Sequence, residues 1–386
     1  MVPADMFCPA DACPLRGQRG QGNIHIHSQT ERRFRCLTCG ATFAETRGTP
    51  FYGLRNSQEL VTCVVTLLTY GCPLPAIVAA FGLDARTVAS WQARAGQHCE
   101  TVHQATVQQG ELALGHVQAD ELWVKTVGRK VWMALALAVP TRLWLGGVVS
   151  ARRDGELIRT LVDGVRRCAR PGPLLVCVDG LASYVTAFRR AFQEQVRTGR
   201  RGRPPQRLPA DFLMGQVIKS RKARAPLGRV VAVTQRAVVG TLAEVTQRVR
   251  DTGGGQLIHT AYIERLNATF RNRLASLVRK GRCLARKERT LHTGMYLVGT
   301  VYNFCRGHDS LRVPVAGPGR RRWRERSPAM AAGLTDHVWS VDELLHFRVA
   351  PPPYRWRKRR GRTPQEPPRV YWKLRPQKYV LCLTTD

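Results

Sequence analysis

Four cysteines near the N-terminus constrain the fold more than any other feature of this chain. Cys8 and Cys13 are separated by four residues, and Cys36 and Cys39 by two. Two pairs of this kind, each on a tight turn, can converge on one ion as the tetrahedral thiolate set of a structural zinc site. A segment this small buries too little apolar surface to fold without the metal. We therefore expect residues 1–50 to form a zinc ribbon around one Zn²⁺.

Other cysteines and histidines offer alternatives to this ligand set. His25 and His27 lie between the two pairs and could replace one cysteine, although unpaired surface histidines are the simpler interpretation. The chain has 12 cysteines, and those outside the quartet are scattered singly, as is typical of buried thiols. The start, MVPADMFCPA, lacks the basic and apolar regions of a signal peptide. No apolar run reaches the roughly 18 residues of a membrane span. We expect a cytoplasmic protein on the nucleoid, with no membrane partner.

The charge of the chain points to a polyanionic partner. Lys and Arg number 61 against 27 Asp and Glu, which gives a formal net charge of +34 and a pI near 11.0. Enzymes of small metabolites rarely need such a field, whereas a nucleic acid would explain it. The alternative is a basic bias of genome composition. The clustering of the excess favours a nucleic acid as the partner, and together with the helix-turn-helix expected below it favours double-stranded DNA.

Residues 55–107 have the pattern of short helices separated by glycine and proline. The expected helices cover residues 57–71, 73–82 and 83–96, with Pro75 in the first turn of the second. Gly82 suits the turn before the third helix. An all-α helix-turn-helix domain fits this arrangement, and an ordinary helical bundle with a solvated basic face is the alternative.

The third of these helices is the expected recognition helix. Asp84 can cap its N-terminus. Apolar residues at helical spacing should face the core, and these are Val88, Trp91 and Ala95. The opposite positions should reach base edges and phosphates, and these are Arg86, Thr87, Ser90 and Arg94.

Residues 112–310 alternate strand-like and helix-like runs, which is typical of an α/β domain around a mixed sheet. The expected strands cover residues 116–127, 130–139, 142–150 and 173–180, and the expected helices cover 156–169 and 184–196. The region around 195–240 looks like an insertion of extra strands joined by basic loops. Contact with DNA backbone is one interpretation of these loops, and a solvated loop is the other.

Three carboxylates stand out by position in this domain. Asp120 lies within a strand-like run, Asp179 ends an apolar strand, and Glu264 lies near the start of a helix for which Thr260 is a plausible N-cap. Carboxylates at strand ends that converge with one from a helix suit Mg²⁺, which also binds phosphate oxygens of a substrate. Any single strand-end aspartate is more often a turn residue, so spacing alone leaves this site open.

The stretch from Cys8 to about Trp339 resembles insertion-sequence transposases of the DDE class. ADELW, VDGLASY and YIERLNATFRNRL match the three acidic blocks of that family in order. Arg271 lies seven residues after Glu264, where the family usually has a basic residue. YNFCRGHDSLR resembles the closing segment of the family, although Gly307 stands where proline is common.

The resemblance implies an RNase H-like fold in which Asp120, Asp179 and Glu264 hold two Mg²⁺ or Mn²⁺ ions. It also implies an enzyme that binds element ends, frees a 3′-hydroxyl with water and joins it to target DNA, as a homo-oligomer on DNA. Asn267 and Arg271 would contact the DNA. Glu121 could replace Asp120 as a ligand if the strand register slipped.

The C-terminal region, residues 311–386, is rich in Arg and Pro. Arg357, Lys358, Arg359 and Arg360 lie beside aromatic residues, where prolines disfavour a long helix. We expect an extended arm on DNA backbone, with an ordinary solvated tail as the alternative. The whole chain is thus expected to be multidomain: zinc ribbon, helix-turn-helix, RNase H-like α/β domain with a basic β insertion, and basic tail.

Two other functional classes remain open at this point. One is a non-catalytic regulator that binds DNA through the ribbon and the helix-turn-helix. The other is a stand-alone RNase H-like nuclease without strand transfer. A copy of an element that has lost activity is a further alternative.

Overall fold

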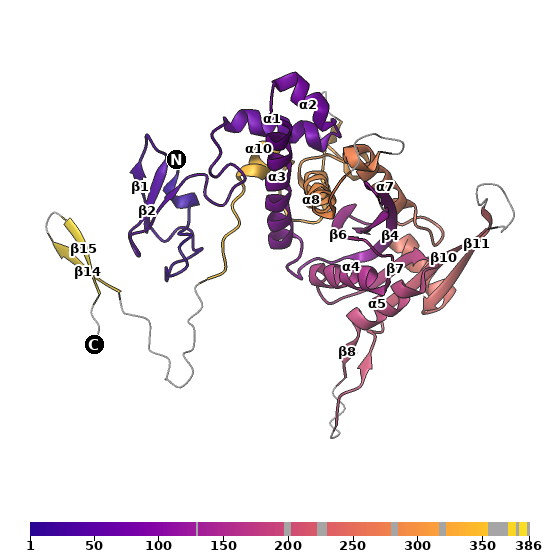
Figure 1. The fold of residues 1–386 in the computed structure, drawn as a ribbon. Coiled ribbons are helices and arrows are strands. Elements are labelled where there is room, and N and C mark those ends of the chain that lie inside the picture. Colours follow the sequence, from indigo (N-terminus) through magenta and orange to yellow (C-terminus); the bar gives the residue numbers. More distant parts are fainter. Residues whose placement is uncertain are drawn as a thin grey trace. The chain divides into compact units, whose positions relative to one another are not determined.

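The computed structural model describes residues 1–128, 130–196, 202–221, 230–278, 285–315, 322–353, 370–375 and 378–383 (Figure 1). The chain divides into two compact units. One unit comprises Met1–Leu54 with Arg348–Asp386, and the other is Arg55–Phe347. Within the described residues, no helix is long and apolar enough to cross a bilayer.

The first unit contains a small antiparallel sheet in the order β1-β2-β3. Its elements are η1 (Pro3–Asp5), β1 (Ile24–Ser28), β2 (Arg33–Cys36) and β3 (Thr42–Ala44), with a separate hairpin of β14 (Val370–Arg375) and β15 (Lys378–Leu383). Phe34 stacks on Phe43 with ring centroids 5.9 Å apart. Only a few apolar side chains join them around the buried cysteines, so this core is small.

A six-stranded mixed sheet, in the order β11-β10-β7-β4-β5-β6, forms the centre of the second unit. The strands are β4 (Gly115–Lys125), β5 (Lys130–Ala138), β6 (Leu143–Ser150), β7 (Leu174–Asp179), β10 (Phe212–Arg221) and β11 (Val230–Val239). β5 pairs antiparallel with β4 and β6, whereas β7 is parallel to β4 and to β10. The mixed α/β sheet expected from the sequence is confirmed, with strand bounds within two residues of those expected for β4 to β7.

Helices cover both faces of this sheet (Figure 1). α4 (Gly155–Cys168) and α5 (Ala182–Phe192) pack together on one face, and α7 (Ala261–Arg273) and α8 (Glu288–Phe304) on the other. Burial on both faces explains why β5 and β7 are almost continuously apolar. Three further helices of this unit are α6 (Leu242–Asp251), η3 (Ala275–Leu277) and η4 (Asp309–Leu311).

The three N-terminal helices of this unit are α1 (Gln58–Thr69), α2 (Leu74–Phe81) and α3 (Ala85–Thr106). α3 continues well beyond Gly96, where the sequence suggested that it ends. Gly96 is buried, and a Cβ there would clash with the Thr293 carbonyl oxygen of α8. This glycine therefore permits a close helix crossing and does not terminate the helix. Because α3 packs along α8, the three helices and the sheet belong to one compact unit.

The expected insertion at residues 195–240 needs a correction. β10 lies inside that range, yet it pairs parallel with β7 from Phe212 opposite Leu174 to Val217 opposite Asp179. Its apolar residues are buried, so β10 belongs to the main sheet. The additional parts are the edge strand β11 and a short hairpin of β8 (Glu194–Gln195) and β9 (Gln206–Arg207). Basic residues flanking β10 obscured its apolar pattern in the sequence.

The expected C-terminal region at 311–386 is divided between the two units. Its first part contains β12 (Val313–Pro314), β13 (Trp323–Arg324), α9 (Pro328–Ala331) and α10 (Val341–His346) and packs with the helices of the large unit. The ring centroids of Trp339 and Phe304 lie 4.6 Å apart. Arg357, Lys358, Arg359 and Arg360 lie outside the described residues.

Candidate metal centres

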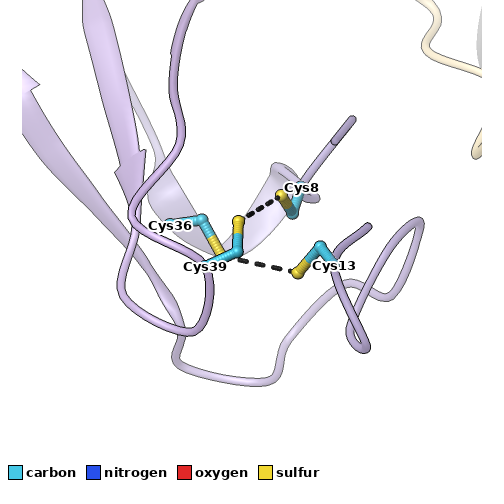
Figure 2. A group of neighbouring side chains, drawn as sticks. All are labelled: Cys8, Cys13, Cys36 and Cys39. Atoms are coloured by element: carbon cyan, nitrogen blue, oxygen red, sulfur yellow. Dashed lines mark hydrogen bonds between the residues drawn. The ribbon is translucent and has the colours of Figure 1, made fainter. Parts of the chain in front are cut away.

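The four N-terminal cysteines converge on one point (Figure 2). Their Sγ atoms all lie within 4.8 Å of one another, with Cys8 3.5 Å from Cys39 and Cys13 3.8 Å from Cys36. Cys36 is the last residue of β2. The turn that follows is closed by a hydrogen bond from the Gly40 N–H to the Cys36 carbonyl at 2.8 Å. The predicted quartet can therefore hold a zinc ion, since all four thiols face a common centre.

Local electrostatics agree with a thiolate site. Burial raises the pKa of Cys8, and it raises the pKa of Cys13 to about 12. Burial also opposes ionisation of Cys36, but backbone N–H groups of Cys39 and Thr38 lower the net pKa of that thiol. The Asn23 amide donates to the Cys36 sulfur at 3.2 Å. Thiols packed this closely can ionise together only when a cation offsets their charge.

His25 and His27 are exposed on β1 and do not join the quartet. The structure thus agrees with the interpretation of these histidines as surface residues.

The second candidate centre is an acidic cleft of about 620 Å³ at the end of β7. The parallel pairing of β4 with β7 extends to Ala119 opposite Val178, so Asp120 and Asp179 follow directly on adjacent strands. Glu264 reaches the same cleft from α7. The other charged residues that line it are Glu121, Arg153 and Lys219. Three acids that are far apart in sequence therefore line one cleft: Asp120 and Asp179 on the adjacent central strands β4 and β7, and Glu264 on α7.

A buried glutamine positions the helix that carries Glu264. Gln118 of β4 is fully buried, and its Oε1 accepts the backbone N–H groups of Tyr262 and Ile263, each at 3.1 Å. The start of α7 is therefore capped from the neighbouring strand. Thr260, the expected cap, makes no capping bond, because its hydroxyl donates to Glu264 Oε1 at 3.0 Å.

The two aspartates share a desolvated, acidic environment. Burial raises the pKa of Asp120 to about 7, and the nearby carboxylates of Glu121 and Asp179 add to this effect. Asn267 donates to Asp120 Oδ2 at 2.8 Å. The pKa of Asp179 is also raised, chiefly by burial, although the Leu181 N–H bonds its Oδ1 at 3.0 Å. Such a pair of acids favours binding of a cation, which replaces their mutual repulsion by attraction.

Glu264 is held in a different way. Its side chain is about half exposed, and Lys219 of β10 donates to its Oε1 at 2.6 Å. Burial opposes ionisation of this carboxyl, but the hydrogen bonds from Lys219 and Thr260 lower its net pKa. Glu264 is thus ionised, and Lys219 is its counter-ion in this structure.

Among the described residues, Asp120, Glu121 and Asp179 form an acidic group whose carboxylate oxygens lie within 4.8 Å of one another, and Glu264 is not part of this group. Glu121 faces Arg153 and Tyr184, while Asp120 faces Asn267. The register places Asp120 opposite Leu135 and shows no slip at this point. Sequence reasoning did not single out Arg153, Lys219 or Gln118, since nothing in their spacing marks them.

The residues expected to contact DNA differ in accessibility. Arg86, Ser90 and Arg94 are exposed on α3, whereas Thr87 is half-buried. The cap by Asp84 and the burial of the apolar side chains of α3 follow the prediction: the Asp84 carboxylate accepts the Arg86 N–H at 2.7 Å.

Asn267 differs from its expected role. It is only 2% exposed, and its amide bonds Asp120, so it supports the acidic cleft from behind. Arg271 is half-buried, one further turn along α7.

No protein-family model matches this chain, and no curated protein sequence matches it either.

Proposed function

We propose that this protein is a DDE-type DNA transposase, an RNase H-like enzyme that cleaves DNA at element ends and transfers the strand to a target. The observation that carries the proposal is the convergence of Asp120, Asp179 and Glu264 in one cleft. The order of the three motifs that contain these acids supports it as well. Bound Mg²⁺ or Mn²⁺ would supply Lewis-acid stabilisation of the attacking and leaving oxygens of an in-line phosphoryl transfer.

The residues that line the cleft would have separate roles in the reaction. Asp120 and Asp179 would hold the metal from the buried side of the cleft, and Glu264 of α7 would be the third ligand. Lys219, which donates to Glu264 and lines the same cleft, would bind a phosphate oxygen of the DNA. Water or a 3′-hydroxyl would be the nucleophile, so the reaction would need no covalent link between protein and DNA.

DNA binding would involve the exposed side of α3 and the basic surface of the chain. A net charge of +34 favours phosphate contacts and counterion release, and a homo-oligomer would bring two element ends together. The cysteine quartet would hold a structural Zn²⁺ that stabilises the small N-terminal core.

A supercoiled plasmid that carries the DNA on both sides of the gene, where the proposal predicts inverted repeats, tests this proposal. With Mg²⁺, the proposal predicts nicked ends and joined products. Nicking without joined products would support the stand-alone nuclease, and binding without either would support the non-catalytic regulator.

A further inference from the structure

Both carboxylate oxygens of Glu121 are already occupied by other side chains. The Glu121 side chain is 1% exposed. Its Oε1 accepts hydrogen bonds from Nε of Arg153, at 2.7 Å, and from Nη2 of the same guanidinium. Its Oε2 accepts the Tyr184 hydroxyl at 2.8 Å. These three hydrogen bonds use most of the roughly four acceptor positions of the carboxylate, so Glu121 has little capacity left for a metal ion.

Arg153 is presented to the cleft by this arrangement. It lies in the connection between β6 and α4, directly before the α4 cap residue Asp154. Its guanidinium is 5.0 Å from the centroid of the Trp132 ring, and both residues line the cleft. The Arg153 side chain remains 41% exposed although Glu121 holds two of its nitrogens. A planar guanidinium fixed by a buried acid and an aromatic face is preorganised for phosphate.

The charges of the cleft support the same assignment. Glu121, Asp120 and Asp179 would place three negative charges within 4.8 Å of one another. The ion pair with Arg153 offsets one of them and leaves the two aspartates for a cation. The geometry thus gives the three acids two roles: Asp120 and Asp179 are available to a metal ion, and Glu121 holds Arg153.

We infer that Arg153 binds a DNA phosphate beside the aspartates, and that Glu121, together with Tyr184, is the positioning residue that orients it. This inference rests on the proposed function, because it assigns the phosphate to the DNA strand that enters the acidic cleft. Glu121 lies close enough to the aspartates to belong to the acidic cluster, but its role is to orient Arg153.

The test compares R153Q, E121Q, Y184F and the double variant E121Q/R153Q of the full chain. DNA affinity is measured by anisotropy with a 40-base-pair duplex of random sequence, over a series of salt concentrations in Ca²⁺. Mn²⁺ affinity is measured by electron paramagnetic resonance without DNA. R153Q should weaken DNA binding roughly 10-fold, since it removes a charge-assisted hydrogen bond. It should also lower the salt slope by about 0.9, the value of one phosphate contact.

If Glu121 acts through Arg153, E121Q should weaken DNA binding and the double variant should be no weaker than R153Q alone. Mn²⁺ affinity should stay near the wild-type value in Y184F and in E121Q/R153Q, because the double variant loses one negative and one positive charge together. Arg152 is the matched control, because it is an exposed arginine next to Arg153 that does not line the cleft. Any effect of R152Q should add to that of E121Q.

Three results would overturn the inference. One is loss of Mn²⁺ binding in the charge-balanced double variant E121Q/R153Q, which would make Glu121 a metal ligand. Another is wild-type DNA affinity and salt slope in R153Q, and the third is additivity in E121Q/R153Q. Should E121Q fail to fold, Y184F and R153Q carry the same comparison. If the wild type cleaves no DNA, the proposed transposase function fails, while the binding measurements still decide the role of Arg153.

Discussion

The raised pKa of Asp120 has a measurable effect on stability. An acid with a higher pKa in the folded than in the unfolded state binds its proton more tightly when folded, so raising the pH destabilises the fold. For Asp120 the loss begins near the unfolded value of 3.8 and is complete above about 7. D120N removes the titrating charge but keeps an oxygen that can accept the hydrogen bond from Asn267.

The size of the effect follows from the shift. A change in pKa from 3.8 to about 7 corresponds to about 4 kcal/mol at 1.36 kcal/mol per unit. Without metal, D120N should therefore be more stable than the wild type by about 4 kcal/mol at pH 8, and by about 2 kcal/mol at pH 5. In a unit of this size, the larger value raises Tm by roughly 6 °C.

Thermal or denaturant unfolding of metal-free protein at pH 5 and pH 8 measures this difference. Mn²⁺ should stabilise the wild type by about 2.7 kcal/mol at 100 times its Kd and leave D120N nearly unchanged. D163N is the control, because Asp163 is exposed on α4 and its loss should change stability by less than about 0.5 kcal/mol. Equal stability of D120N and wild type at pH 8 without metal would refute the reasoning.

Three further predictions concern separate parts of the molecule. Purified protein should contain one Zn²⁺ per chain, and C36S should lose it and unfold residues 1–50; metal analysis that finds no zinc, or a folded C36S segment, would contradict this. R86A should relax the preference for element ends over random DNA in competition binding, whereas an equal loss for all sequences would make Arg86 a phosphate contact. K219M should raise Mn²⁺ affinity severalfold in titrations without DNA, because Glu264 loses its competing partner; an unchanged or lower affinity would exclude that competition.

Local patterns predicted much of this fold. The cysteine spacing predicted the quartet, because ligand pairs on tight turns depend on nearby residues only. The strands β4 to β7 are long apolar runs, and the cap at Asp84 is a local signal. By contrast, the meaning of Gly96 depends on Thr293, nearly 200 residues away, and a glycine at a helix crossing has the same local signature as a helix end.

The candidate site was predicted in its acids but not in its supporting residues. Asp120 and Asp179 stand at strand positions that parallel pairing brings together. Gln118, Arg153 and Lys219 act through partners on other elements, and their identity follows only from the assembled sheet. The same holds for Asn267, which the sequence predicted as a DNA contact and which is buried with its amide bonded to Asp120.

The central claim is that Asp120, Asp179 and Glu264 form one metal-dependent strand-transfer centre. Joined products from pre-cleaved element ends and a target plasmid, measured in Mg²⁺ for D120N, D179N, E264Q and the triple variant, test it most directly. Because such residues act as a unit, each single variant should lose joining nearly as completely as the triple variant, while DNA binding persists. Normal joining by D179N or E264Q would contradict the account.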